Sequence, residues 1–156
     1  MTVTTLADLT RLTGLDVLDH LERQVSIPVI DGLQAQGDLI VIPIGILSEV
    51  AISDGAHWND VPPSGVELLR GGAGGNPHTL AADHGACRWT TGVHDPVGLA
   101  LGALETSQVA YLIHPEHGGT GIAPGTYVVR RQRERLRSRR PGDGTLGYQA
   151  VQLVAD

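Results

Sequence analysis

The amino-acid sequence predicts a mainly β domain with two short helices at the N-terminus and a protruding basic β-hairpin near the C-terminus. Glycine accounts for 21 of the 156 residues, well above the usual share of roughly 7%. Short branched apolar runs alternate with turn residues after position 28, whereas helical spacing is confined to the first 25 residues. The expected architecture is therefore a barrel, a sandwich or a clip-like β fold.

The composition is that of one folded domain with an aliphatic core. A chain of 156 residues with 41% hydrophobic content is long enough to bury such a core. Phe is absent, so Val, Leu, Ile and Ala must supply most of the buried side chains. The single cysteine, Cys87, excludes an internal disulfide bond. We expect residues 1–25 to form a helical segment and residues 26–156 to form the β domain.

The N-terminal segment carries a leucine at every third position, which favours helices with one buried stripe. Thr4 or Thr5 can cap a first helix, Gly14 can end it, and a second helix is expected over Asp16–Gln24. The spacing also fits a helix-turn-helix, but the second helix would be acidic, whereas a helix that reads DNA needs positive or amide side chains. A packing or interface role is therefore favoured.

Strands are expected wherever an apolar run lies between clusters of Gly, Pro, Asn, Asp or Ser. Leu39–Ile46 is the most apolar of these runs and is typical of a strand buried on both faces. The other candidates are Glu49–Ile52, Val66–Arg70, Cys87–Thr91, Val97–Leu104, Gln108–Ile113, Thr126–Arg137 and Gln149–Val154.

The charge of the chain is unevenly distributed. Seven of the 11 Arg lie within Arg130–Arg140, opposed there only by Glu134, so that segment carries +6. The remainder has four Arg and 16 acidic residues, or −12, and the chain has no Lys. Such a strand cannot be buried along this stretch, so we expect residues 130–147 to leave the body as a two-stranded arm. Alternation along the strand would place five arginines on one face: Arg131, Arg133, Arg135, Arg137 and Arg139.

Three interpretations of the basic arm remain open. It could be a solvated edge strand whose charges prevent aggregation. It could dock on the acidic body of a neighbouring copy, since head-to-tail contacts of this kind build rings or shells. It could also bind nucleic acid through phosphates. This third interpretation is less favoured, because no aromatic residues interleave the arginines for base stacking and the protein is acidic overall.

The histidines suggest one candidate metal site in the loops. His114 and His117 flank Glu116 at the end of an expected strand, and His78 lies in another polar loop. Imidazole nitrogens with a carboxylate suit zinc or another divalent metal, and a metal-bound water could act as a nucleophile. The pattern is not the helical His-Glu-x-x-His signature. The alternative is that these side chains hydrogen-bond to the backbone and hold turns.

Other chemistry finds little support in the sequence, and no catalytic residue is assigned. The absence of Lys removes Schiff-base chemistry and a Walker-type phosphate loop. Cys87 is most simply a small buried hydrophobic residue. The start of the chain lacks the features of a signal peptide, and no apolar stretch is long enough to cross a bilayer. A cytoplasmic location is expected, or a virion location if the protein is phage-encoded.

Three stretches resemble an uncharacterised family of small proteins from bacteria and their phages. They are Gln36-Gly-Asp-Leu-Ile-Val-Ile-Pro-Ile, the loop Gly75-Asn-Pro-His78, and His114-Pro-Glu-His-Gly followed by Pro124-Gly-Thr-Tyr-Val-Val-Arg-Arg-Gln-Arg-Glu134. The resemblance covers Gln36–Glu134 and implies no established activity. The usual Gly-His-x-His loop of the family retains only His78 here.

The function expected from these features is that of a non-enzymatic structural or assembly protein. It would form a homo-oligomer through the basic arm on an acidic body, as a shell, capsid-associated or scaffold component, without a cofactor. Another assembly protein is a further partner to consider. The alternatives are a metal-dependent enzyme or small-molecule binder that uses the loop histidines, and a nucleic-acid-associated protein.

Overall fold

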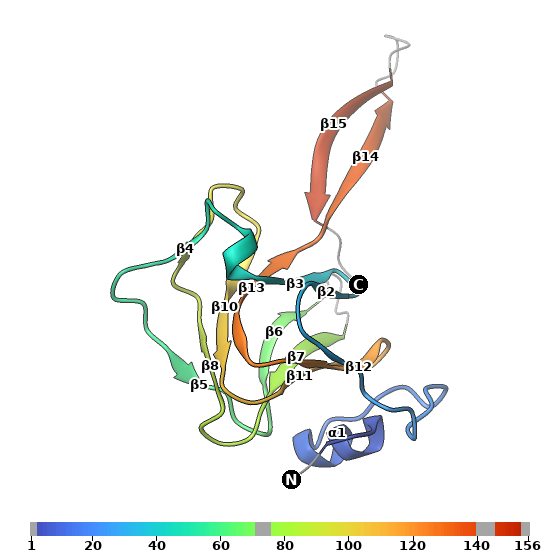
Figure 1. The fold of residues 1–156 in the computed structure, drawn as a ribbon. Coiled ribbons are helices and arrows are strands. Elements are labelled where there is room, and N and C mark those ends of the chain that lie inside the picture. The colour runs from blue at the N-terminus through green and yellow to red at the C-terminus, as the bar shows by residue number, and fades with distance from the viewer. Residues whose placement is uncertain (1–2, 71–75, 140–145, 154–156) are drawn as a thin grey trace.

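The computed structural model describes residues 3–70, 76–139 and 146–153, with the backbone alone described beyond Gln132. Two β-sheets form the body, a single helix lies against one of them, and a two-stranded arm extends away from the body (Figure 1). The mainly β prediction is confirmed. Among the described residues, the two large sheets do not close into a barrel.

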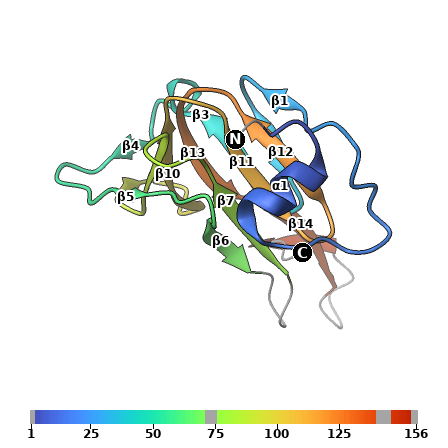
Figure 2. The same ribbon diagram turned by 90° about the horizontal axis from the view of Figure 1, so that it is seen from below.

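The first sheet has five strands and carries the N-terminal segment on its outer face (Figure 2). Its first pair of strands is parallel and the others are antiparallel. The strand order is β1 (Val29–Ile30), β12 (Gly118–Ile122), β11 (Ala110–His114), β7 (Pro77–Ala81) and β6 (Val66–Arg70).

The second sheet has six strands, all antiparallel. Its order is β2 (Gln34–Gln36), β3 (Leu39–Pro43), β13 (Gly125–Arg131), β10 (Ala100–Thr106), β8 (Cys87–Thr90) and β5 (Asn59–Asp60). A short 3-10 helix, η1 (Ile44–Ile46), follows β3. Two further pairs are β4 (Ala51–Ile52) with β9 (Val93–His94) and β14 (Arg133–Arg139) with β15 (Leu146–Leu153).

The main core lies between the two large sheets. Leu39 and Val129 from one sheet pack with Leu80, Leu112 and Ile122 from the other, and all five are fully buried. Burying a side chain of this size contributes roughly 1.5–3 kcal/mol relative to leaving it in water. The expectation of an aliphatic core is met, with Trp89 and Tyr127 as its only large aromatic members among the described residues.

The N-terminal segment contains one helix, α1 (Leu6–Thr13), where two were expected. Thr5 accepts a hydrogen bond from the Asp8 backbone N–H, and the Asp8 carboxylate accepts from the Thr5 backbone N–H, so the helix begins with a capping box. Gly14 ends it in a left-handed conformation, with φ of 71°.

The expected second helix over Asp16–Gln24 is wrong. The Asp16 carboxylate accepts a hydrogen bond from the adjacent Val17 N–H and pairs with Arg23, while Leu18 N–H donates to the Pro115 carbonyl. These tertiary contacts hold the segment in an irregular path, which overrides its modest helical preference. Val17 is nevertheless buried in a small second core, whereas Leu15 and Leu18 of the predicted leucine stripe are exposed.

The second core attaches the N-terminal segment to the outer face of the first sheet. Leu6, Leu9 and Ile27 pack there against Ile113 of β11. The contact depends on Gly119 in β12, because a Cβ atom at that position would overlap the side chains of Leu9 and Ile27. The glycine-rich strand β12 is therefore shaped for close packing of the helix, although its composition is typical of a turn.

Most expected strands are present, but several short ones were missed. Leu39–Ile46 forms β3 and then η1, and the arginine-rich run forms two strands, β13 and β14, that break at Gln132. Two of the missed strands are β7, which begins at Pro77, and β12, which begins with two glycines; Gly and Pro in a sequence usually indicate turns. Among the described residues, no helix is long and apolar enough to span a membrane.

Gly102 in β10 is expected to be intolerant of any side chain. A Cβ atom there would overlap the Thr90 carbonyl oxygen and the Trp89 ring, and the backbone oxygen cannot move without breaking the sheet. We predict that Gly102→Ala lowers the free energy of unfolding by about 1–3 kcal/mol, as measured by urea denaturation. The matched control is Gly45→Ala, whose Cβ would meet no atom within 4 Å. Equal stability of the two variants would contradict this account of the packing.

Candidate functional site

His78 lies at the centre of a buried polar network that joins the two sheets. Its ring is on β7, and its side chain and that of Asp38 are each only 1% exposed. His78 Nε2 lies 2.8 Å from Asp38 Oδ1, and His78 Nδ1 lies 3.1 Å from Gln36 Oε1. Gln36 and Asp38 flank the turn between β2 and β3, so the contacts run from one sheet to the other.

The hydrogen-bond directions define the protonation of His78. The Gln36 side-chain amide nitrogen donates to the carbonyls of Leu112 and Gly118, so its oxygen must be the atom that faces His78. Both His78 nitrogens then face acceptors, a carboxamide oxygen and a carboxylate oxygen. This arrangement is satisfied when both ring nitrogens carry protons. With both ring nitrogens protonated, Asp38 and His78 form a buried carboxylate–imidazolium pair.

His114 has a different role, at the end of β11. Its Nδ1 accepts hydrogen bonds from the backbone N–H groups of Glu116 and His117, at 3.0 and 3.3 Å. The ring therefore holds the tight turn between β11 and β12, and its proton resides on Nε2. The His114 ring is fully buried and its centroid lies 4.3 Å from that of His78.

His117 completes a row of three imidazole rings that runs from the buried network to the surface. Its ring centroid lies 4.5 Å from that of His114 and 6.2 Å from that of His78, and its side chain is exposed. The Glu116 carboxylate is directed elsewhere and accepts a hydrogen bond from the Asn76 side chain at 3.0 Å. The structure thus brings three of the four predicted metal ligands into contact as rings.

The chemistry of these rings suits structure more readily than metal binding in the geometry observed. His78 uses both nitrogens within the protein, and His114 uses Nδ1 to hold a turn. Among the described residues, no group of three or more His, Cys, Asp or Glu side chains is arranged to hold a metal ion. A metal site at His78, His114, Glu116 and His117 stays a prediction. The placement of His78 in a loop is wrong, because it lies within β7.

Cys87 is not an activated nucleophile. Its side chain is buried at the start of β8 and is part of the main core. Burial raises the pKa of the Cys87 thiol to about 11, although a hydrogen bond with the Thr106 side chain opposes the shift. The thiolate is therefore scarce at neutral pH.

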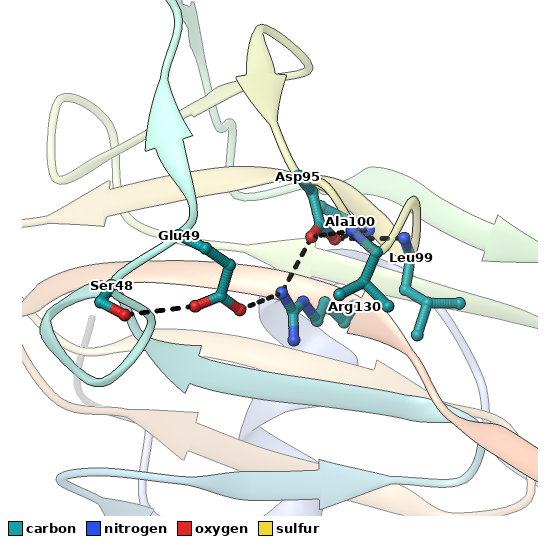
Figure 3. A network of polar contacts seen from close by, with 7 residues as sticks. Ser48, Glu49, Asp95, Leu99, Ala100 and Arg130 are labelled. Atoms are coloured by element: carbon teal, nitrogen blue, oxygen red, sulfur yellow. Dashed lines mark hydrogen bonds and ion pairs between the residues drawn. The ribbon is translucent and has the colours of Figure 1, made fainter.

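Arg130 anchors the point at which the chain leaves the body. Its guanidinium lies between two carboxylates from separate loops, 2.9 Å from Asp95 Oδ1 and 3.3 Å from Glu49 Oε1 (Figure 3). The Arg130 side chain is only 13% exposed and that of Asp95 only 3%. Arg130 therefore belongs to the body, whereas the sequence placed it in the solvated arm.

Asp95 is held in its charged form by its surroundings. Burial acts to raise the pKa of Asp95, but hydrogen bonds from the backbone N–H groups of Val97, Ala100 and Leu99, together with Arg130, outweigh it. The net effect is a pKa below its ordinary value. The carboxylate thus orders the loop that precedes β10 and presents a fixed negative charge to Arg130.

The next two residues connect the root of the arm to the buried network. The Arg131 backbone N–H donates to the Leu99 carbonyl, and the Gln132 N–H donates to the Asp38 carbonyl at 2.7 Å. Arg131 pairs with Leu39 in the sheet register and is half-buried. Of the predicted partner-binding arginines, Arg131 therefore belongs to the body. The other four lie on β14 of the arm: Arg133, Arg135, Arg137 and Arg139.

The arm itself is a two-stranded antiparallel sheet made only of β14 and β15. The pairing runs from Arg133 with Leu153 at the root to Arg139 with Leu146 at the far end. Figure 1 shows the pair extending away from the body. The predicted hairpin is thus confirmed for its two strands, and the predicted tip, residues 140–145, lies outside the described residues.

These features define a small two-sheet β protein with a buried histidine network beneath a projecting arm. A family model described as "Domain of unknown function (DUF8820)" matches residues 35–132, so the chain belongs to that family. Comparison with curated proteins gave no match, and neither did comparison with solved structures. The family region contains the histidine network and Arg130, whereas α1 and the arm lie outside it.

Sequence reasoning identified the histidines but missed Gln36, Asp38 and Asp95. The polar pair at Gln36 and Asp38 stands directly before the most apolar strand of the chain, where buried polar side chains need partners. The location of Gln36 and Asp38 beside a buried strand was the sequence signal that could have indicated buried partners such as His78. No local pattern marks Asp95 as a partner of Arg130, because the two residues are far apart in the sequence and come into contact only when the sheet forms.

We predict that His78 carries two ring protons at neutral pH, whereas His114 carries one, on Nε2. Long-range ¹H–¹⁵N correlation spectra of the histidine side chains measure this directly. The variant Asp38→Asn should remove the second proton from His78 and leave the His114 tautomer unchanged. An unprotonated His78 nitrogen in the unsubstituted protein would contradict the assignment.

Proposed function

We propose that this chain is a non-enzymatic structural protein that forms a homo-oligomer, in which the arm of one copy docks on the acidic body of the next. The observation that carries the proposal is the arm, a two-stranded sheet that pairs with no other strand among the described residues. The class of protein that we propose is a shell, capsid-associated or scaffold component of bacteria or their phages.

An isolated two-stranded sheet is marginally stable at best in water, because it has no hydrophobic layer to bury. The side of the arm that carries alternating arginines in the sequence cannot supply such a layer by itself. A second surface that covers the arm would provide the missing contacts. Docking in another copy supplies that surface without a further partner.

The root of the arm is built to give it a fixed direction. Arg130 is clamped by Asp95 and Glu49, and Gln132 is bonded to the Asp38 backbone above the buried network. A flexible tail would not need a root anchored by an ion pair with a 3% exposed carboxylate. A fixed exit direction favours repeated, geometrically uniform contacts between copies.

The body offers the opposite charge. Among its described side chains, ten carboxylates are exposed but only two guanidinium groups, those of Arg11 and Arg88. Both of these are paired, with Asp8 and Glu105 respectively. The exposed charge of the body is therefore strongly negative. A basic arm is attracted to it, and the attraction weakens as salt is added.

The direct test changes Arg133, Arg135 and Arg137 together to Ser. We expect the unsubstituted protein to form a discrete oligomer that dissociates with salt, and the variant to associate at least about tenfold more weakly because three attractive charges are lost. Size-exclusion chromatography with light scattering, at low and moderate salt, measures the mass of each species.

The matched control removes three arginines from the body instead, through Arg11→Ser, Arg70→Ser and Arg88→Ser. This control has the same net charge as the arm variant and should assemble like the unsubstituted protein. Unchanged assembly in the arm variant would contradict the proposal. So would a monomer that carries a stoichiometric divalent metal, which would support the histidine-based alternative, or a monomer that binds nucleic acid in a salt-dependent manner.

A further inference from the structure

We propose that the arm docks on residues 15–29 of a neighbouring copy, here named the acceptor segment, which runs from the end of α1 to the first residue of β1. This inference rests on the proposed function and specifies the surface that receives the arm. Exposed apolar side chains, acidic charge and a groove coincide on the acceptor segment, at the opposite end of the molecule from the arm.

The acceptor segment exposes an unusual share of apolar surface. Seven large hydrophobic side chains are exposed among the described residues, and four of them belong to these 15 positions. Val25 and Val29 are 51% and 53% exposed, and Leu15 and Leu18 are 37% and 39% exposed. Concentrations of this kind mark surfaces that are covered in an assembly, whereas single exposed hydrophobic residues are common on any protein.

The same segment carries negative charge that its own arginine does not neutralise. Asp16 pairs with Arg23 at 3.0 Å, but the Asp19 carboxylate lies 3.8 Å from Arg23 and is fully exposed. The Glu22 side chain is also exposed, and among the described residues it accepts one hydrogen bond, from the nearby Gln24 backbone N–H. Two carboxylates thus face solvent among apolar neighbours.

A groove of about 420 Å³ runs beside these residues, between the acceptor segment and strand β12. Leu21, Val25 and Pro28 supply apolar walls, and Glu22 supplies a carboxylate. Thr120 and Gly119 of β12 form the opposite side of the groove. The groove therefore combines apolar walls with one carboxylate.

The arm has the complementary composition. Strand β14 alternates arginines with Glu134, Leu136 and Ser138, and β15 contains Tyr148, Val151 and Leu153. The arm is basic and contains apolar residues, whereas the acceptor segment is acidic and exposes apolar residues. Opposite charges would determine which surfaces meet, and contact between the apolar side chains would bury hydrophobic surface. The occupant that fits is therefore the arm of a second copy.

Two observations place this contact between copies rather than within one. The arm and α1, with the segment that follows it, lie at opposite ends of the body (Figure 1), so an arm does not reach its own acceptor segment. The arm and the acceptor segment also both lie outside the family region of residues 35–132. A contact in which one end of a copy meets the other end of the next is head-to-tail and builds rings or open chains.

The test reverses the charge of each surface separately and then mixes the variants. The acceptor variant is Asp19→Arg with Glu22→Arg, and the arm variant is Arg135→Glu with Arg137→Glu. Each variant alone should associate at least about tenfold more weakly than the unsubstituted protein, since like charges then meet. An equimolar mixture should assemble again, because each copy presents an arm that matches the other copy's acceptor segment. Sedimentation velocity measures the size and the amount of each oligomeric species.

The matched control is Asp54→Arg with Asp60→Arg, the same charge change on exposed side chains elsewhere on the body, and it should assemble normally. If the acceptor variant assembles normally while the arm variant does not assemble, residues 15–29 are not the docking surface. The proposed function would still stand in that case. An unsubstituted protein that stays monomeric would overturn both. If circular dichroism shows that both variants are folded but their mixture does not assemble, the assignment of the acceptor segment as the docking surface is also contradicted.

Discussion

The buried pair of Asp38 and His78 is the interaction on which the rest of the structure depends. It joins the turn after β2 in one sheet to β7 in the other, and Gln36 extends the link to the carbonyls of β11 and β12. Removal of one member of such a pair costs about 3–5 kcal/mol, because the other charge is left buried. The same Asp38 backbone holds Gln132, so the network also supports the root of the arm.

This constraint explains why the histidines are better understood as parts of the scaffold. His78 satisfies two acceptors, and His114 holds the turn that leads into β12. Only His117 of the three rings is exposed. The hydrogen bonds of Gln36, Asp38 and His78 thus tie the two sheets together at this end of the body, although Asp38 Oδ2 is buried without a hydrogen-bond partner among the described residues. Buried hydrogen bonds of this kind rigidify a core. A rigid end is what a projecting arm needs for a defined direction.

The mainly β class, the aliphatic core and the two strands of the arm could be predicted from the sequence, because alternation and branched apolar runs are local signals. The path of the chain after Gly14 could not, because contacts with Pro115 and Arg23 decide it. Strand β12 was missed because its glycines indicate turns in a sequence, whereas in the fold one of them, Gly119, allows Leu9 and Ile27 to pack closely. Likewise, His78 could be singled out, but its partners on β2 and β3 become neighbours only when the sheets meet.

The central claim is that the arm is stable because another copy covers it. Hydrogen exchange of the backbone amides of β14 and β15, measured by mass spectrometry at low salt and at a salt concentration that dissociates the oligomer, tests that claim most directly. Our account predicts slow exchange of the arm in the assembled state and fast exchange in the monomer, with the core strands β3 and β13 protected in both. Equal exchange of the arm in the two states would contradict it.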